Sequence, residues 1–175
     1  MSLTPMPKMK SKPLMINPQT VPETMAERLE KIGIILPVAA APVAAYVPTV
    51  EACGLLHVSG QLPFDNGLLM VGRLGEDRDL AFGTAAARAC GLMVLAQISA
   101  ALGGLDRVER VVKLGVFVNS DARFTDQPKV ANGASELMVE VFGDAGKHAR
   151  AAVGVPSLPM GAAVEVDAIV ALRAA

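Results

Sequence analysis

Apolar residues recur at two different spacings along the chain, which predict helices in some segments and strands in others. Residues 23–33 place Met25, Leu29 and Ile32 at helical spacing among charged residues, which predicts a short helix. Residues 79–102 contain no proline and are dominated by Ala, Leu and Met, so they predict a long helix that ends at two successive glycines. A further helix is expected from Pro128, with an apolar stripe, to a glycine at 143.

Short runs rich in β-branched residues, separated by Gly, Pro or Asn-Gly turns, predict the strands. Three such runs within residues 43–75 predict a meander, in which Asn66 and Gly67 form a hairpin turn. Another strand is predicted at 110–120. Two more are predicted in HARAAVGVPSLPMGAAVEVDAIV, residues 148–170, which closes the chain.

The order of these elements is strands, long helix, strand, helix, strand and strand. This order predicts an α+β fold in which two helices cover one face of a sheet. A length of 175 residues and a hydrophobic content of 52% suit one domain, expected over residues 23–175. Residues 1–22 are rich in Pro, Met and Lys and predict a flexible tail.

The composition disfavours several classes of function. With 16 basic and 17 acidic residues and 3% aromatics, the chain has neither the charge nor the stacking surface typical of nucleic-acid binding. The two cysteines and two histidines lack metal-ligand spacing, so we expect no metal and no cofactor. Three prolines interrupt the uncharged run 32–50, which disfavours a membrane span, and no secretory signal precedes it. Cytoplasmic localisation is the resulting expectation.

Candidate chemistry lies in the closing segment, where Arg150 occurs on a strand of small residues. Side chains alternate across a strand, so Arg150 shares a face with Ala152, and Glu165 shares a face with Asp167. If the two runs form an antiparallel hairpin with Val155 opposite Ala162, Arg150 lies opposite Asp167. All the charged groups then fall on one face of the sheet.

Two interpretations of these charges are open from the residues alone. One is a cross-strand ion pair on a solvated face, which would contribute roughly 0.2–1 kcal/mol. The other is a ligand site, because the small residues beyond Arg150 leave space in which a guanidinium can grip a carboxylate. A nearby carboxylate could then orient or activate water.

The sequence resembles the RidA/YjgF family, also called endoribonuclease L-PSP. The resemblance is carried by AAYVPTVEACGLLHVSGQLP at 44–63, VVKLGVFVNSDARF at 111–124, VANGASELMVEVFG at 130–143, and the closing segment. It implies a chorismate-mutase-like fold that assembles as a homotrimer, with sites in clefts between subunits.

The resemblance also implies roles for particular residues. Arg150 matches the arginine that binds the substrate carboxylate, and Glu165 matches the glutamate that positions the hydrolytic water. The matches to the positions that line the substrate pocket are Tyr46, Ser59, Asn132 and Ala152. Ala152 replaces a cysteine that is frequent in the family, which removes any thiol-dependent role. One extra residue between Asn132 and Arg150, and the N-terminal extension, also depart from the family pattern.

The leading hypothesis is therefore a cofactor-free enzyme that hydrolyses 2-imino or 2-enamino acids to 2-keto acids and ammonia. A small-molecule carboxylate would be its substrate, and copies of the same chain its partners. One alternative is a protein that binds keto acids without turnover. Another is an endoribonuclease-like translation inhibitor, which follows only from the family label and which the absence of a basic patch disfavours.

Overall fold

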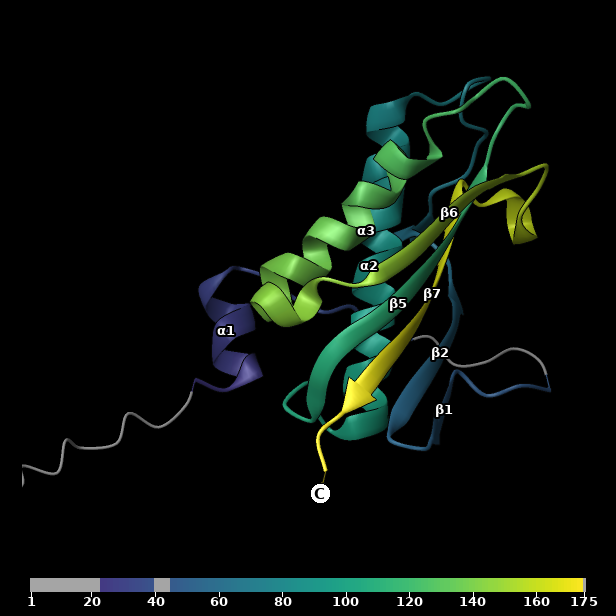
Figure 1. Cartoon of the computed structure of the whole chain (residues 1–175). Helices are drawn as coiled ribbons and strands as arrows, with labels where there is room; N and C mark the ends of the chain where they lie inside the picture. Colours follow the sequence, from purple (N-terminus) through teal and green to yellow (C-terminus); the bar gives the residue numbers. More distant parts are fainter. Residues whose placement is uncertain (1–22, 40–44, 175) are drawn as a thin grey trace, which may run out of the picture.

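The computed structural model describes residues 23–39 and 45–174 (Figure 1). The tail predicted at 1–22 lies outside the described residues. The elements in chain order are α1 (Met25–Lys31), β1 (Thr49–Ala52), β2 (Leu55–Gln61), β3 (Phe64–Asp65), β4 (Leu68–Leu69), α2 (Leu80–Leu102), β5 (Val108–Asn119), α3 (Gln127–Phe142), the 3-10 turn η1 (Gly143–Gly146), β6 (Ala149–Val155), the 3-10 turn η2 (Pro159–Gly161) and β7 (Val164–Leu172).

Five strands form one sheet in the order β1-β2-β7-β5-β6. All neighbours are antiparallel except β5 and β6, which run parallel because α3 makes the crossover between them. The predicted turn at Asn66 and Gly67 joins the short strands β3 and β4, but these form a separate two-stranded sheet, so the third run of the predicted meander does not extend the main sheet. The two turn residues, Asn66 and Gly67, both have positive φ, as a tight hairpin turn requires.

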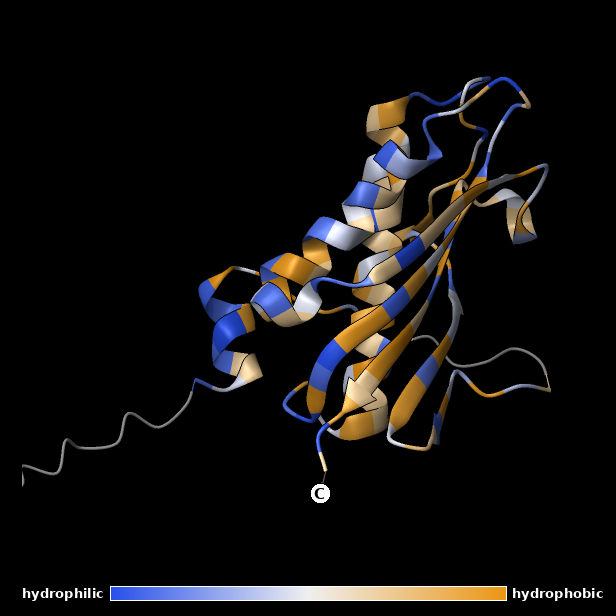
Figure 2. Ribbon diagram, viewed as in Figure 1, coloured by the Kyte–Doolittle hydropathy of each residue, from blue (hydrophilic) through white to orange (hydrophobic). Residues whose placement is uncertain are grey.

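Both long helices cover the same face of the sheet, which confirms the predicted α+β class (Figure 1). The alternation along β7 shows which face is covered, because Val164, Val166 and Ala168 are buried in the core. Glu165 and Asp167 therefore point to the opposite, open face. Figure 2 shows hydrophobic residues along α2 and the strands, whereas α1 is mainly hydrophilic.

The long helix α2 begins and ends where the sequence predicts. The Asp79 side chain accepts from the Phe82 amide at 2.8 Å and caps the N-terminus, and Gly103 ends the helix with a φ of 72°. Gly133 lets α3 approach closely, since a Cβ there would overlap the backbone carbonyl oxygen of Thr84. The helix is long and apolar enough to cross a membrane, but most of that apolar stretch is buried inside the domain, as in a core helix.

The predicted N-terminal helix is present as α1 and is docked on the domain. Thr24 and Glu27 form a capping box at its start. The Arg28 guanidinium donates to the carbonyls of Val141 and Glu140 at the C-terminal end of α3. These bonds satisfy carbonyls that the end of a helix leaves without intrahelical partners.

The predicted hairpin between the last two strands is wrong. The strand β5 lies between β6 and β7 and pairs with both, so Arg150 lies opposite Leu114 and Asp167 opposite Gly115. The physical reason is that a strand, a helix and a second strand form a parallel crossover unit, which places β6 directly beside β5. The 12-residue β5 thereby gains neighbours on both edges, and β6 becomes an edge strand.

Candidate functional site

The guanidinium of Arg150 is held by three acceptors on α3. Its Nη1 donates to Asn132 Oδ1 at 3.0 Å and to Ser135 Oγ at 2.9 Å, and its Nη2 donates to the Pro128 carbonyl at 3.1 Å. Positions 128, 132 and 135 follow the i, i+4, i+7 pattern, so they form one stripe along the helix. Because Leu114 is the β5 partner of Arg150 and is buried, the arginine lies on the helix-covered side of the sheet.

This guanidinium keeps a free positive charge. All three of its acceptors are neutral, and among residues 23–39 and 45–174 no carboxylate lies within ion-pair distance of it. The residue itself is exposed at the edge of the sheet. An oriented, uncompensated guanidinium at a surface suits an anionic ligand, above all a planar carboxylate.

Ala152 and Gly154 follow Arg150 along the same face of β6. Ala152 packs against the hydrophobic core, so it contributes apolar surface beside the arginine. A Cβ at Gly154 would come within 2.7 Å of Ser120 Oγ and 2.8 Å of Gln127 Nε2. The glycine therefore leaves room for the polar side chains of Ser120, which follows β5, and Gln127, which begins α3, and a cavity of about 330 Å³ lies at this end of β6.

Glu165 lies on the other face of the sheet, on β7 beside β2. Its carboxylate packs so closely on Gly60 that a Cβ at that position would overlap Oε1. Burial raises the pKa of Glu165, and the neighbouring Asp167 carboxylate raises it further. Asp167 itself accepts from the Gly115 amide at 3.0 Å. A carboxylate with a raised pKa is suited to take a proton from water near neutral pH.

Ser59 lies on the same face of the sheet as Glu165, and the segment that follows Tyr46 runs beside it. The Ser59 hydroxyl donates to the Val47 carbonyl at 3.0 Å, and its amide donates to the Pro48 carbonyl at 2.9 Å. These bonds fasten the segment that carries Tyr46 alongside β2. The Tyr46 side chain is exposed, with 51% of its surface accessible, so its ring is available for contact.

The candidate residues therefore form two groups on opposite faces of one sheet. Arg150, Asn132 and Ala152 lie on the helix-covered side at the β6 edge, and Glu165 and Ser59 lie on the open side. The prediction that the charged groups share a face is wrong for this reason. Within one chain, a ligand held by Arg150 is separated from Glu165 by the sheet itself.

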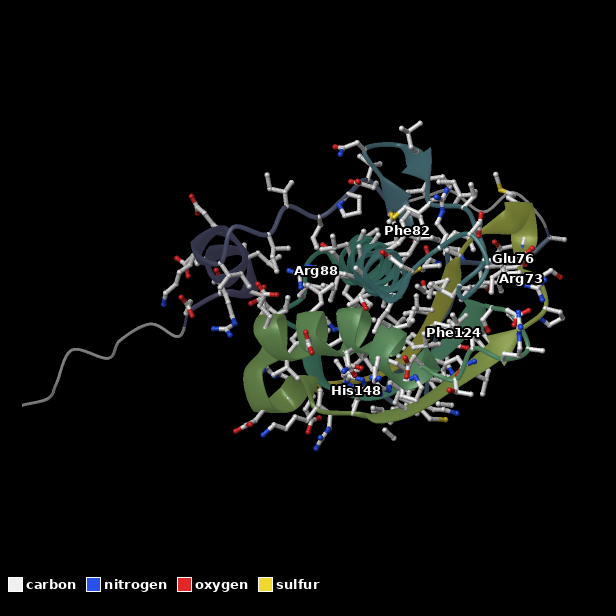
Figure 3. All side chains as sticks on the ribbon, turned by 90° about the horizontal axis from the view of Figure 1, so that it is seen from above. Arg73, Glu76, Phe82, Arg88, Phe124 and His148 are labelled. Atoms are coloured by element: carbon white, nitrogen blue, oxygen red, sulfur yellow. The ribbon has the colours of Figure 1, made fainter. Side chains whose placement is uncertain are left out.

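Sequence reasoning missed two polar residues behind Arg150. Ser135 contacts both Arg150 and His148, and the His148 ring also contacts the Gly146 carbonyl. In Figure 3 the histidine lies between α3 and the start of β6. Helical spacing from Asn132 to Ser135, and strand spacing from His148 to Arg150, are the signals that could have found them.

Comparison with known proteins places the chain in a family. Residues 26–172 match the profile of the family described as "YjgF/chorismate mutase-like, putative endoribonuclease". The chain belongs to the YjgF/RidA family.

Three relatives illustrate the range of this family. Protein TCP17 of Trypanosoma cruzi is 59% identical over 151 residues, which cover 85% of this chain and 94% of that protein. The crystal structure of Atu1372 from Agrobacterium tumefaciens, a protein of unknown function, is 47% identical, with a TM-score of 0.78 over 86% of this chain and 94% of that one. E. coli TdcF, solved with bound serine, is 25% identical, with a TM-score of 0.56 over 78% and 94% of the two chains.

Proposed function

We propose that this YjgF/RidA member hydrolyses 2-imino and 2-enamino acids to 2-keto acids and ammonia in sites shared between protomers of a homotrimer. The observation that carries the proposal is the Arg150 guanidinium, which three neutral acceptors orient and no carboxylate neutralises among the described residues. Such a group binds the carboxylate that every substrate of this class carries. The serine bound by the relative TdcF also has a carboxylate, which supports the same ligand chemistry here.

The proposed reaction adds water to the imine carbon. Glu165 accepts a proton from water as the water oxygen bonds to that carbon, and the imine nitrogen takes up a proton. Glu165 then returns its proton to the amino nitrogen of the tetrahedral carbinolamine, the carbon-nitrogen bond breaks to release ammonia, and the hydroxyl proton passes to solvent as the keto group forms. The raised pKa of Glu165 favours this proton transfer near neutral pH. No oxidant or reductant is needed.

The opposite placement of Arg150 and Glu165 supports a site made by two protomers. The β6 edge carries Arg150, and the open sheet face carries Glu165, so the edge of one protomer would lie against the open face of the next. That arrangement would also cover apolar surface that a single chain leaves exposed, including Val153 at 46% and Val50 at 51%. Tyr46 and Ser59 would line the Glu165 side, and Asn132 and Ala152 the arginine side.

Mixed assembly tests this proposal directly. Arg150→Ala and Glu165→Gln chains should each lack activity in an ammonia-release assay with freshly generated 2-iminopropanoate. If each site takes Arg150 and Glu165 from different protomers, random trimers from equal amounts of the two should restore both groups at about one site in four. Native mass spectrometry would verify that mixed trimers form. Mixed trimers without activity would overturn the shared site, and an inactive wild-type protein would overturn the reaction.

Binding of keto acids without turnover is the second candidate. The Arg150 side is complete on its own in one protomer, so carboxylate binding needs less of the assembly than hydrolysis does. Tight pyruvate binding by a wild-type protein that releases no ammonia would select this function. The ribonuclease label belongs to the family description, and the near-neutral charge of the chain gives it no support here.

A further inference from the structure

A chain of hydrogen bonds connects Arg150 to a histidine that the proposed reaction does not use. Ser135 Oγ lies 2.9 Å from Arg150 Nη1 and 3.0 Å from His148 Nε2. The other ring nitrogen of His148, Nδ1, lies 2.6 Å from the Gly146 carbonyl oxygen. These hydrogen bonds thus connect the arginine, through a residue of α3, to the turn that precedes β6.

The chemistry of these groups fixes which atom donates and which accepts in each of these hydrogen bonds. The Gly146 carbonyl can only accept, so Nδ1 carries a proton and donates it there. Arginine can only donate, so Ser135 Oγ accepts from Arg150. The hydroxyl proton of Ser135 then points to Nε2 of His148, whose lone pair is available only when the ring is neutral. Each of the three hydrogen bonds that link Arg150, Ser135, His148 and Gly146 then has one donor and one acceptor, and this holds only while the imidazole is neutral.

We propose that His148 is a positioning residue that acts through Ser135 to fix the Arg150 guanidinium for carboxylate binding, and that it does so only while its imidazole is neutral. The inference rests on the proposed role of Arg150 as the carboxylate anchor and extends it to regulation by pH. Protonation at Nε2 would turn the acceptor into a donor that faces Ser135 Oγ. The hydroxyl proton would lose its acceptor, and a second cation would lie no more than about 6 Å from the guanidinium nitrogen, since both are hydrogen-bonded to the same Ser135 Oγ.

Arg150 is the charged group that acts on the ring of His148, and the other charged residues of the elements beside it have partners elsewhere or only follow its contacts in sequence. Arg110 on β5 donates through its Nη2 to the Lys147 carbonyl. Lys147 and Asp144 pair with each other at 2.7 Å beside η1, and Glu136 follows Ser135 on α3. None of the three carboxylate or ammonium groups is within hydrogen-bond distance of the ring, whose partners are Ser135 and Gly146.

The half-buried setting of His148 supports a neutral ring at neutral pH. Burial lowers the pKa of His148, the bond to the Gly146 carbonyl opposes that shift, and the Arg150 charge adds to it. The hydrogen-bond chain is then intact at neutral pH and breaks as the pH falls through this lowered pKa.

Pyruvate titration by calorimetry between about pH 8 and pH 5 tests the inference, because this range extends well below the ordinary histidine pKa of about 6.5, toward the lowered pKa of His148. Wild-type affinity should weaken about tenfold toward the acid end, the scale of one hydrogen bond to a charged group. His148→Gln keeps an acceptor for Ser135 but cannot titrate, so it should bind as the wild type does at neutral pH and stay constant on acidification. Ser135→Ala and His148→Leu should bind about tenfold more weakly at every pH.

The chain has two histidines, so His57→Gln is the matched control and should retain the wild-type pH dependence. Affinity that instead rises on acidification, or an unchanged profile in His148→Gln, would overturn the inference. Nitrogen-15 spectra of the ring give a second readout that needs neither ligand nor turnover. They should show the Nδ1–H tautomer at neutral pH, and finding the Nε2–H tautomer would also refute the relay. Failure of ammonia release alone would refute only the proposed reaction.

Discussion

Replacing Gly60 with alanine should displace the Glu165 carboxylate without disturbing the fold. A Cβ at this position would overlap Oε1 and lie 2.8 Å from the carboxyl carbon Cδ. Carbon atoms in contact are separated by about 3.5–4.0 Å, so the carboxyl group must move by about 1 Å. The displaced atoms are the free end of a flexible side chain, and the backbone φ of Gly60 is not in the left-handed region. Stability should therefore change by less than about 1 kcal/mol.

Activity should respond far more strongly than stability. A misplacement of about 1 Å in a catalytic group can lower the rate about a hundredfold, so kcat should fall to that extent. The Michaelis constant should change less, because the Arg150 guanidinium that anchors the substrate carboxylate comes from the neighbouring protomer in the proposed site and keeps its acceptors on α3. The assay is ammonia release from 2-iminopropanoate, paired with urea unfolding of the same samples.

Gly115→Ala is the matched control for this change. A Cβ there would press on the neighbouring acid, with Asp167 Cγ at 3.0 Å, so it displaces a carboxylate that has no proposed catalytic role. Its kcat should stay within a few-fold of the wild type. Wild-type kcat in Gly60→Ala, or an equal loss in both variants, would refute the assignment of Glu165 as the group that activates water.

Three further predictions concern pH and packing. Because the pKa of Glu165 is raised in the folded state, this residue contributes stability that is fully present below the usual glutamate pKa and is lost as the pH rises through the raised pKa. The kcat should rise over the same pH range, because the Glu165 carboxylate forms there. Asp167→Asn should move this acid limb of the kcat profile to lower pH, but only in part, because burial is the larger cause; an unmoved limb would exclude Glu165 as its origin. Gly133→Ala should destabilise the domain by about 1–3 kcal/mol in urea unfolding, since its Cβ would lie 2.9 Å from the Thr84 carbonyl carbon and force α2 and α3 apart. Wild-type stability in that variant would contradict the packing of the two helices.

The features that the sequence predicts well are those with local causes. The ends of α2 follow from a capping aspartate, Asp79, and a left-handed glycine, Gly103, and the β3–β4 hairpin follows from Asn66 and Gly67. The α+β class follows from the order of the elements. The helix ends and the hairpin depend on contacts between residues close in sequence, and such contacts can be predicted from the pattern of residues.

The pairing of β6 failed because it depends on contacts that are distant in sequence. Two successive apolar strands look like a hairpin, yet β6 pairs with β5 on the far side of a helix. That choice decides which face Arg150 occupies, because its parallel partner Leu114 points into the core. The assignment of Arg150 and Glu165 as candidate residues came from the family resemblance and is still a prediction. Only their relative placement required the structure.

The separation of the two charged groups also explains how the competing functions can be told apart. A site that only binds a carboxylate needs the guanidinium and the three acceptors on α3, all of which lie in one protomer. Hydrolysis also needs a base, and a single sheet cannot present residues of its opposite faces to one small ligand. Perturbing Gly60 should therefore affect mainly turnover, whereas perturbing Ser135 should affect mainly carboxylate binding. A Gly60→Ala protein that loses pyruvate affinity as strongly as it loses turnover would show that the Glu165 side of the site also anchors the ligand carboxylate.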